Sequence, residues 1–196
     1  MPRFEPPKPT KRALSELSLD GWENATLPAS SIDWHSYAFC YRRAADTLVK
    51  EFAVPAIGPH GMFLPILFLY RHYLETTLKG LLLDSADLLG QEVKVPTDHL
   101  LTPLWKQLRA RLERVLPGHG SEWLDRCGEL IEEFQQLDPR SMTFRYPEDT
   151  HGVTMLMPGF QISVKQVSEV MKEIQYVLDG AAGLLDEYLS LNYGEL

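Results

Sequence analysis

The 196-residue sequence has 19 Lys and Arg against 27 Asp and Glu, a formal net charge of −8 at pH 7. This acidic balance excludes a protein coated with basic charge for binding nucleic acid without selectivity. With 44% hydrophobic and 23% charged residues, the composition is typical of a folded globular protein with a sizeable core. The longest apolar run, residues 62–70, is too short for a membrane-spanning helix.

The N-terminal 30 residues are predicted to form an arm, and residues 31–196 a single domain. Five of the 14 prolines lie in this arm, which shows no sustained apolar period and no apolar core of a secretory signal. We therefore expect no membrane association and a cytoplasmic protein. The two cysteines, Cys40 and Cys127, stand alone in helical patterns and are predicted to be core residues.

The first two helices are predicted over residues 32–52 and from Met62 to Leu83 or Leu89. In the first, apolar side chains recur every three or four residues and define one buried face: Tyr37, Tyr41, Ala44, Ala45 and Leu48. The second is apolar on nearly every side, which is typical of a helix surrounded by neighbours. It is therefore predicted to lie at the centre of a bundle.

Two helices of opposite charge are predicted next. One opens after Thr97 and ends before Pro117, and its outward side chains are mainly basic: Lys106, Arg109, Arg111 and Arg114. The other spans residues 121–137, with Trp123 and Cys127 among the residues predicted to face inward and five acidic residues facing outward. The outward side of the first of these two helices is the one basic face expected on this acidic protein.

A long ordered loop and a last helix complete the predicted fold. Residues 138–161 are rich in proline and glycine, and the apolar period resumes after Ser163 and continues to about Leu189. Loops longer than about 12 to 15 residues are uncommon unless they carry function. The sequence thus predicts an all-α protein, a four-to-five-helix up-and-down bundle whose long loop before the last helix is a candidate site region.

A charged stripe interrupts the apolar second helix. Arg71, Glu75 and Lys79 are spaced by four residues and share one face, with His72 beside them. If this face is buried, the charges must pair, because an isolated ion in a core is very unfavourable. One interpretation is a structural ion-pair network, and the other is a polar cleft that presents Arg71 and His72 to an anion. His72 and Glu75 supply too few ligands for a metal site.

Two further segments are candidates for the same polar cluster. Asp98 and His99 open the third helix, where Asp98 is expected to cap the helix and His99 to reach the charged stripe. In the loop, Arg145 is expected to point inward to Glu75, with Phe144 and Tyr146 anchoring the chain. Arg71, Glu75, His99 and Arg145 are therefore predicted to form one cluster.

Three short motifs in order resemble the HEPN (higher eukaryotes and prokaryotes nucleotide-binding) superfamily. They are the Glu75-x-x-Leu78-Lys79-Gly80 helix signature, the His99-x-Leu101-x-x-Leu104 helix start, and the Arg145-Tyr146-Pro147 turn. The resemblance covers residues 34–190. It implies a helical bundle, usually a homodimer, in toxin–antitoxin or phage-defence systems, acting as a binding or dimerisation module for a nucleotide, RNA or an antitoxin-type protein partner, without a cofactor.

The resemblance also implies an alternative activity, that of a metal-independent endoribonuclease. Active members carry an Arg followed by a His after four to six residues, and this chain offers Arg145 with His151 and Arg114 with His119. In this reading Arg145 positions the scissile phosphate and His151 assists proton transfer at the 2′-OH. Each pair is separated by a proline, which breaks a helix. The binding module is therefore the favoured prediction.

Overall fold

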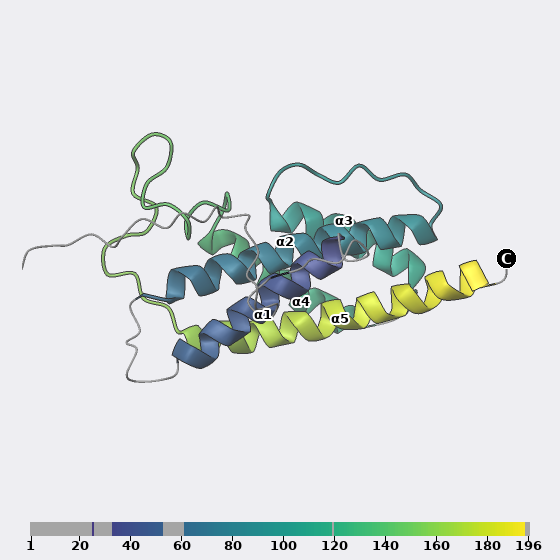
Figure 1. Ribbon diagram of the computed structural model, residues 1–196. Coiled ribbons are helices and arrows are strands. Elements are labelled where there is room, and N and C mark those ends of the chain that lie inside the picture. Colours follow the sequence, from purple (N-terminus) through teal and green to yellow (C-terminus); the bar gives the residue numbers. More distant parts are fainter. Residues whose placement is uncertain (1–24, 26–32, 53–60, 119, 195–196) are drawn as a thin grey trace, which may run out of the picture. The chain divides into compact units, whose positions relative to one another are not determined.

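A computed structural model describes residue 25 and residues 33–52, 61–118 and 120–194. The predicted N-terminal arm therefore lies outside the described residues, apart from Ala25, and so does His119. The described residues from Asp33 onward belong to one compact unit. They contain five helices and no strand: α1 (Trp34–Phe52), α2 (Phe63–Leu88), α3 (Leu101–Val115), α4 (Ser121–Leu137) and α5 (Val164–Gly194) (Figure 1). The prediction of an all-α bundle is confirmed.

Helix α2 lies at the centre, as its apolar sequence predicts. It packs against α1, α3 and α5, and 16 of its 26 residues are buried. Gly80 on α2 lets α1 approach closely, because an added Cβ there would lie 2.9 Å from the His35 ring. None of the helices in the described ranges combines the length and the apolar character needed to cross a bilayer.

The order of helix directions follows from the contacts between their ends. His35 contacts Asp84 and Asp46 contacts Tyr70, so α1 and α2 are antiparallel. The start of α3 lies beside Lys79, whereas Arg111 near its end reaches Gln91, so α3 runs parallel to α2. Residues 89–100 return along the bundle to make this possible (Figure 1). Consecutive helices are thus antiparallel, as in an up-and-down bundle, except for α2 and α3, which run parallel.

The long loop before α5 is held by its own hydrogen bonds and by aromatic anchors. Glu148 and Thr154 form an antiparallel bridge, which closes a small hairpin. Phe144 is buried against Phe134, whereas Tyr146 is 51% exposed. Of the two expected anchors, only Phe144 is buried.

Several side chains lie on the opposite side of a helix from the predicted one. On α1, Tyr37 and Ala44 are exposed and Ala38 is buried, and Cys40 is exposed instead of buried. On α4, Trp123 is 56% exposed and its neighbour Leu124 is buried. The physical reason is that neighbouring residues of a helix are about 100° apart around its axis, so a one-residue error in the centre of the apolar face moves a side chain from the buried to the exposed side.

Candidate functional site

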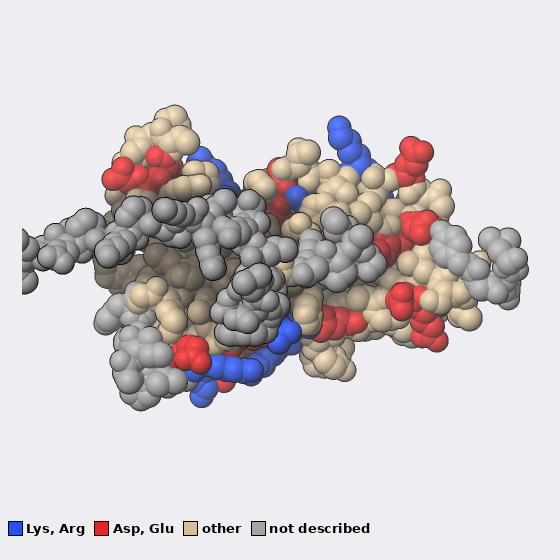
Figure 2. All heavy atoms as spheres, viewed as in Figure 1, with Lys and Arg blue, Asp and Glu red and all other residues tan. Residues whose placement is uncertain are grey.

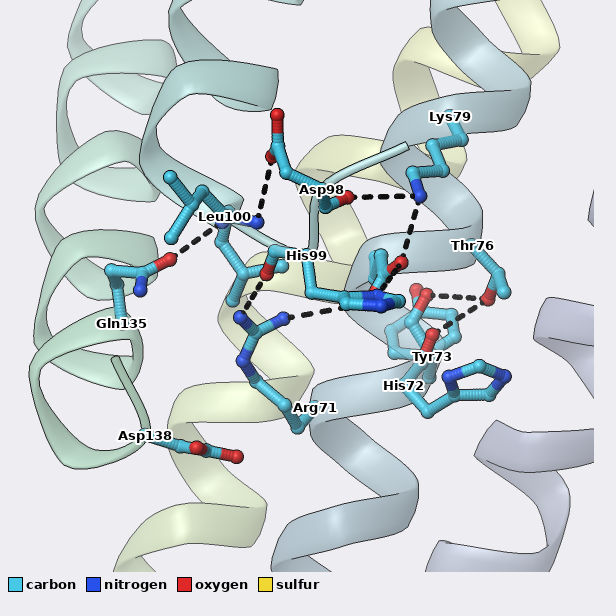
Figure 3. A network of polar contacts seen from close by, with 12 residues as sticks. Arg71, His72, Tyr73, Thr76, Lys79, Asp98, His99, Leu100, Gln135 and Asp138 are labelled. Atoms are coloured by element: carbon cyan, nitrogen blue, oxygen red, sulfur yellow. Dashed lines mark hydrogen bonds and ion pairs between the residues drawn. The ribbon is translucent and has the colours of Figure 1, made fainter. Parts of the chain in front are cut away.

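A buried polar cluster surrounds Glu75 on α2. Its carboxylate oxygen Oε1 accepts hydrogen bonds from Lys79 Nζ at 2.8 Å and from His99 Nδ1 at 2.8 Å (Figure 3). Arg71 lies one turn away, with Nη1 4.0 Å from Glu75 Oε2, and its guanidinium also donates to the His99 carbonyl. The i, i+4 spacing of the stripe thus brings both of its cations, Arg71 and Lys79, to the Glu75 carboxylate.

The cluster extends from the buried core to the protein surface. The Arg71, Glu75 and Lys79 side chains are 0%, 5% and 6% exposed, whereas the His99 side chain is 55% exposed. Burial acts to raise the pKa of Glu75, but the hydrogen bonds and charges of Lys79 and His99 outweigh it, so the pKa lies below its ordinary value. Glu75 is therefore a carboxylate at neutral pH.

An ionised Glu75 determines the orientation of the His99 ring. A carboxylate only accepts hydrogen bonds, so His99 Nδ1 must carry the proton that lies between them. In the neutral imidazole, Nε2 is then an acceptor, and in the protonated ring it is a donor. His99 is consequently an exposed, oriented acid–base group that a buried ion-pair network holds in place.

Asp138 is a member of this cluster that the sequence interpretation did not single out. It is fully buried at the end of α4 and lies opposite Arg71 (Figure 3). Its Oδ1 accepts from the backbone N–H groups of Met142 and Thr143 at 2.8 and 3.0 Å. Burial lowers the pKa of Arg71, and the charges of Asp138 and Glu75 oppose that shift. The signal for Asp138 is its position directly after a helix and before a turn, where an Asp can accept from free N–H groups.

The start of α3 is capped differently from the prediction. Asp98 Oδ1 accepts from Leu100 N at 3.1 Å, within the turn before the helix. The first helical N–H, that of Leu101, instead donates to Gln135 Oε1 on α4 at 2.6 Å. Gln135 also donates to the Pro139 carbonyl. This glutamine therefore joins the start of α3 to the loop that carries Asp138.

The prediction that Arg145 points inward to Glu75 is wrong. Arg145 is exposed, and its guanidinium lies 5.7 Å from the Phe68 ring centre and 5.5 Å from that of Tyr146. Glu75 already has Arg71, Lys79 and His99 as partners, so Arg145 is not needed to neutralise it. Arg145 is consequently a surface cation held between two aromatic rings.

His72 lies on α2 beside the cluster, but its ring points toward α1 (Figure 3). Its ring contacts Tyr41 edge to face at 4.2 Å and stacks with Phe68 at 6.0 Å. Burial lowers the pKa of His72, and the nearby charges of Arg145 and His99 lower it further. His72 is therefore neutral at physiological pH and contributes an aromatic surface.

Arg145 and His151, the two residues predicted for ribonuclease chemistry, do not contact each other in the described structure. Arg145 precedes the hairpin, whereas His151 is at its tip, where its backbone N–H donates to Asp149 Oδ1 at 2.8 Å. No contact joins the two side chains in the described residues. In the same part of the chain, no three His, Cys, Asp or Glu side chains form a group that could hold a metal ion.

The basic face of α3 is partly neutralised. Arg109 donates to Glu113 at 2.8 Å and forms a second ion pair with Asp125 on α4, and Arg111 donates to Gln91. The described surface seen in Figure 2 carries separate groups of basic and acidic side chains. His99 and Arg145 are the other exposed candidates for contact with an anion.

No family model, curated protein or solved structure matches the chain significantly. The HEPN resemblance therefore stays a prediction from its three short motifs.

Proposed function

We propose that this chain is a helical binding module that holds a phosphorylated ligand, a nucleotide or a segment of RNA, at the surface formed by His99, Arg145 and Tyr146. The observation that carries the proposal is the exposed His99 imidazole, which buried Glu75 holds through Nδ1. His99 and the exposed Arg145 both lie close enough to His72 to lower its pKa. A guanidinium and an imidazolium both donate hydrogen bonds to phosphate oxygens.

Local charge supports an anion at this surface despite the acidic chain. Inside the cluster, the two cations Arg71 and Lys79 balance the two carboxylates Glu75 and Asp138. The Asp98 carboxylate is directed at the Leu100 N–H. Arg145 therefore adds positive charge outside a balanced core.

Aromatic rings beside the cation favour a ligand with a flat base. Tyr146 is 51% exposed next to Arg145, and the Phe68 ring also lies beside the guanidinium. Unpaired bases stack on such rings and on arginine planes, with little dependence on base identity. A nucleotide or single-stranded RNA supplies both the phosphate and the base that this surface fits.

The endoribonuclease alternative has no observation in its favour, because Arg145 and His151 do not share a site in the described structure. A role in a bacterial toxin–antitoxin or phage-defence system, with an antitoxin-type partner in the cytoplasm, is part of the proposal on the resemblance alone.

Fluorescence anisotropy at low salt tests the proposal, with a fluorescent ATP analogue and a short labelled single-stranded RNA as separate probes. We expect binding of at least one probe, and about tenfold weaker binding by Arg145→Ala, since one charge-assisted contact is worth about 1.5 kcal/mol or more. Arg140→Ala is the matched control, because Arg140 is exposed in the same loop. Absence of binding, or equal losses in both variants, would contradict the proposal.

A further inference from the structure

His99 and His151 are both exposed, but their rings are held differently. The His99 Nδ1 atom lies 2.8 Å from Glu75 Oε1, and the His99 carbonyl accepts from the Arg71 guanidinium (Figure 3). His151 is held through its backbone N–H, which donates to Asp149, and its ring has no polar partner among the described residues. The two histidines therefore offer different ring atoms to a ligand.

The contact with Glu75 determines which nitrogen of His99 faces a ligand. Burial acts to raise the pKa of Glu75, but the hydrogen bonds and charges of Lys79 and His99 outweigh it, so Glu75 is a carboxylate at neutral pH. A carboxylate only accepts hydrogen bonds, so Nδ1 keeps its hydrogen whether or not the ring is charged. Nε2 is consequently the ring nitrogen that remains for a ligand.

The charge of the His99 ring decides what Nε2 can bind. In the neutral ring Nε2 has a lone pair and no hydrogen, so it repels a phosphate oxygen, which also carries lone pairs. In the protonated ring Nε2 donates a charge-assisted hydrogen bond to that oxygen. A histidine without a carboxylate partner, such as His151, can place its single hydrogen on either nitrogen and donate while neutral. The Glu75 contact removes this choice from His99.

We infer that a phosphate group binds His99 only together with a proton, which comes from the solvent and stays on Nε2. The proton on Nδ1 remains with Glu75, and no covalent bond of the ligand changes. Binding at this surface is therefore coupled to pH, and it tightens as the pH falls through the range in which histidine side chains titrate, about pH 5 to 8. The inference rests on the proposed function, because it concerns the phosphate held at that surface.

Charged and titratable side chains surround His99 on several elements. They come from α2, from the turn before α3, from the end of α4 and from the long loop: Arg71, His72, Glu75, Lys79, Asp98, Asp138 and Arg145. The pKa of Glu75 lies below 4.5, and burial lowers the pKa of His72, which is neutral at physiological pH. A pH dependence of binding that disappears with the His99 imidazole is therefore assigned to His99.

Fluorescence anisotropy of a labelled oligouridylate at about pH 5.5 and about pH 8.5 tests the coupling, because its phosphodiesters and bases keep the same charge across the histidine range. Physiological ionic strength screens the distant histidines. We expect the wild type to bind about tenfold more tightly at the lower pH, since it gains one charge-assisted contact.

Two matched variants assign the effect. His99→Asn keeps an N–H at the position of Nδ1 for Glu75 and removes the outer nitrogen. It is expected to bind at both pH values as weakly as the wild type does at about pH 8.5. His151→Asn, a change at an exposed histidine whose ring has no polar partner among the described residues, is expected to keep the wild-type dependence.

Calorimetry of whichever probe binds, the oligouridylate or the ATP analogue, counts the proton directly from the heats in two buffers of different ionisation enthalpy. We expect the wild type to take up more protons than His99→Asn, by at most one per site. Equal uptake, an affinity of the wild type that does not change with pH, or a change that His99→Asn retains would overturn the inference and leave the proposed binding intact. Absence of binding of both probes at either pH would contradict the proposed function as well.

Discussion

The polar cluster on α2 and the basic face of α3 each contain an ion pair between a glutamate and a basic side chain four residues away, in two different environments. Lys79 and Glu75 are four residues apart with N and O atoms at 2.8 Å, and so are Arg109 and Glu113. The side chains of the first pair are 6% and 5% exposed, and those of the second 29% and 54%. Exposed pairs contribute about 0 to 1 kcal/mol, whereas removing one partner of a buried pair costs about 3 to 5 kcal/mol. Burial therefore decides what each pair contributes.

The largest expected effect is that of Glu75→Gln. This change leaves Arg71 and Lys79 buried without the carboxylate they share, so we expect the free energy of unfolding to fall by about 4 kcal/mol. Glu113→Gln is the matched control, with an expected change below about 0.5 kcal/mol. Urea denaturation measures both. Similar losses of stability in the two variants would contradict the claim that burial decides what each ion pair contributes.

The loss of stability caused by Glu75→Gln is expected to depend on pH. Burial acts to raise the pKa of Glu75, and the bonds from Lys79 and His99 lower it below the ordinary 4.5. The contribution of ionised Glu75 to the stability of the fold is thus present above pH 4.5, and it is lost as the pH falls through the lower, folded-state pKa. The stability difference between wild type and Glu75→Gln is expected to be constant at neutral pH and to shrink in acid. A difference independent of pH down to acid unfolding would argue against ionised Glu75.

Lys79→Met is expected to cost less, about 2 kcal/mol. Glu75 keeps Arg71 and His99 as partners, so its charge is not left alone. The methionine also retains the apolar stem that packs within the core. Chemical denaturation beside Glu75→Gln ranks the two variants. A loss in Lys79→Met that equals or exceeds that of Glu75→Gln would mean that Lys79, and not Glu75, is the centre of the cluster.

The smallest effect is expected at the half-exposed pair of His35 and Asp84, which joins α1 to α2 at 2.8 Å. The hydrogen bond to Asp84 raises the pKa of His35 above its ordinary 6.5. Its contribution is therefore complete below pH 6.5 and is lost as pH rises through the higher, folded-state pKa. His35→Gln is expected to cost at most about 1 kcal/mol at pH 5.5 and less at pH 8.5. The opposite pH trend in thermal unfolding would contradict this assignment.

The fold was predictable because periodicity reports which segments have an apolar face. The bounds of α4 agree with the sequence prediction at both ends, and α2 with its centre position follows from an almost uninterrupted apolar pattern. The pattern does not show which residue of a face lies deepest, and so it predicts Trp123 and Tyr37 to face inward, whereas both are exposed. It also cannot show that α3 runs parallel to α2, because this depends on how residues 89–100 cross the bundle.

The charged stripe could be predicted as paired because three charges in an apolar helix have no other stable arrangement. Its connection to His99 follows from a turn that comes back to α2. The position of Arg145 could not be derived, because a loop cation has both carboxylates and aromatic rings as alternative partners. Asp138 was missed because its role depends on Arg71, which is distant in sequence.

The central claim is that buried Glu75 orients exposed His99 for a phosphorylated ligand. Nitrogen-15 NMR of the histidine side chains tests it most directly, with Glu75→Gln used to assign the His99 signals. We expect His99 Nδ1 to carry the proton that lies between it and Glu75, and the ATP analogue or RNA to shift the Nε2 signal of His99 but not that of His151. An Nδ1 without a proton, or ligand shifts at His151 alone, would contradict the account.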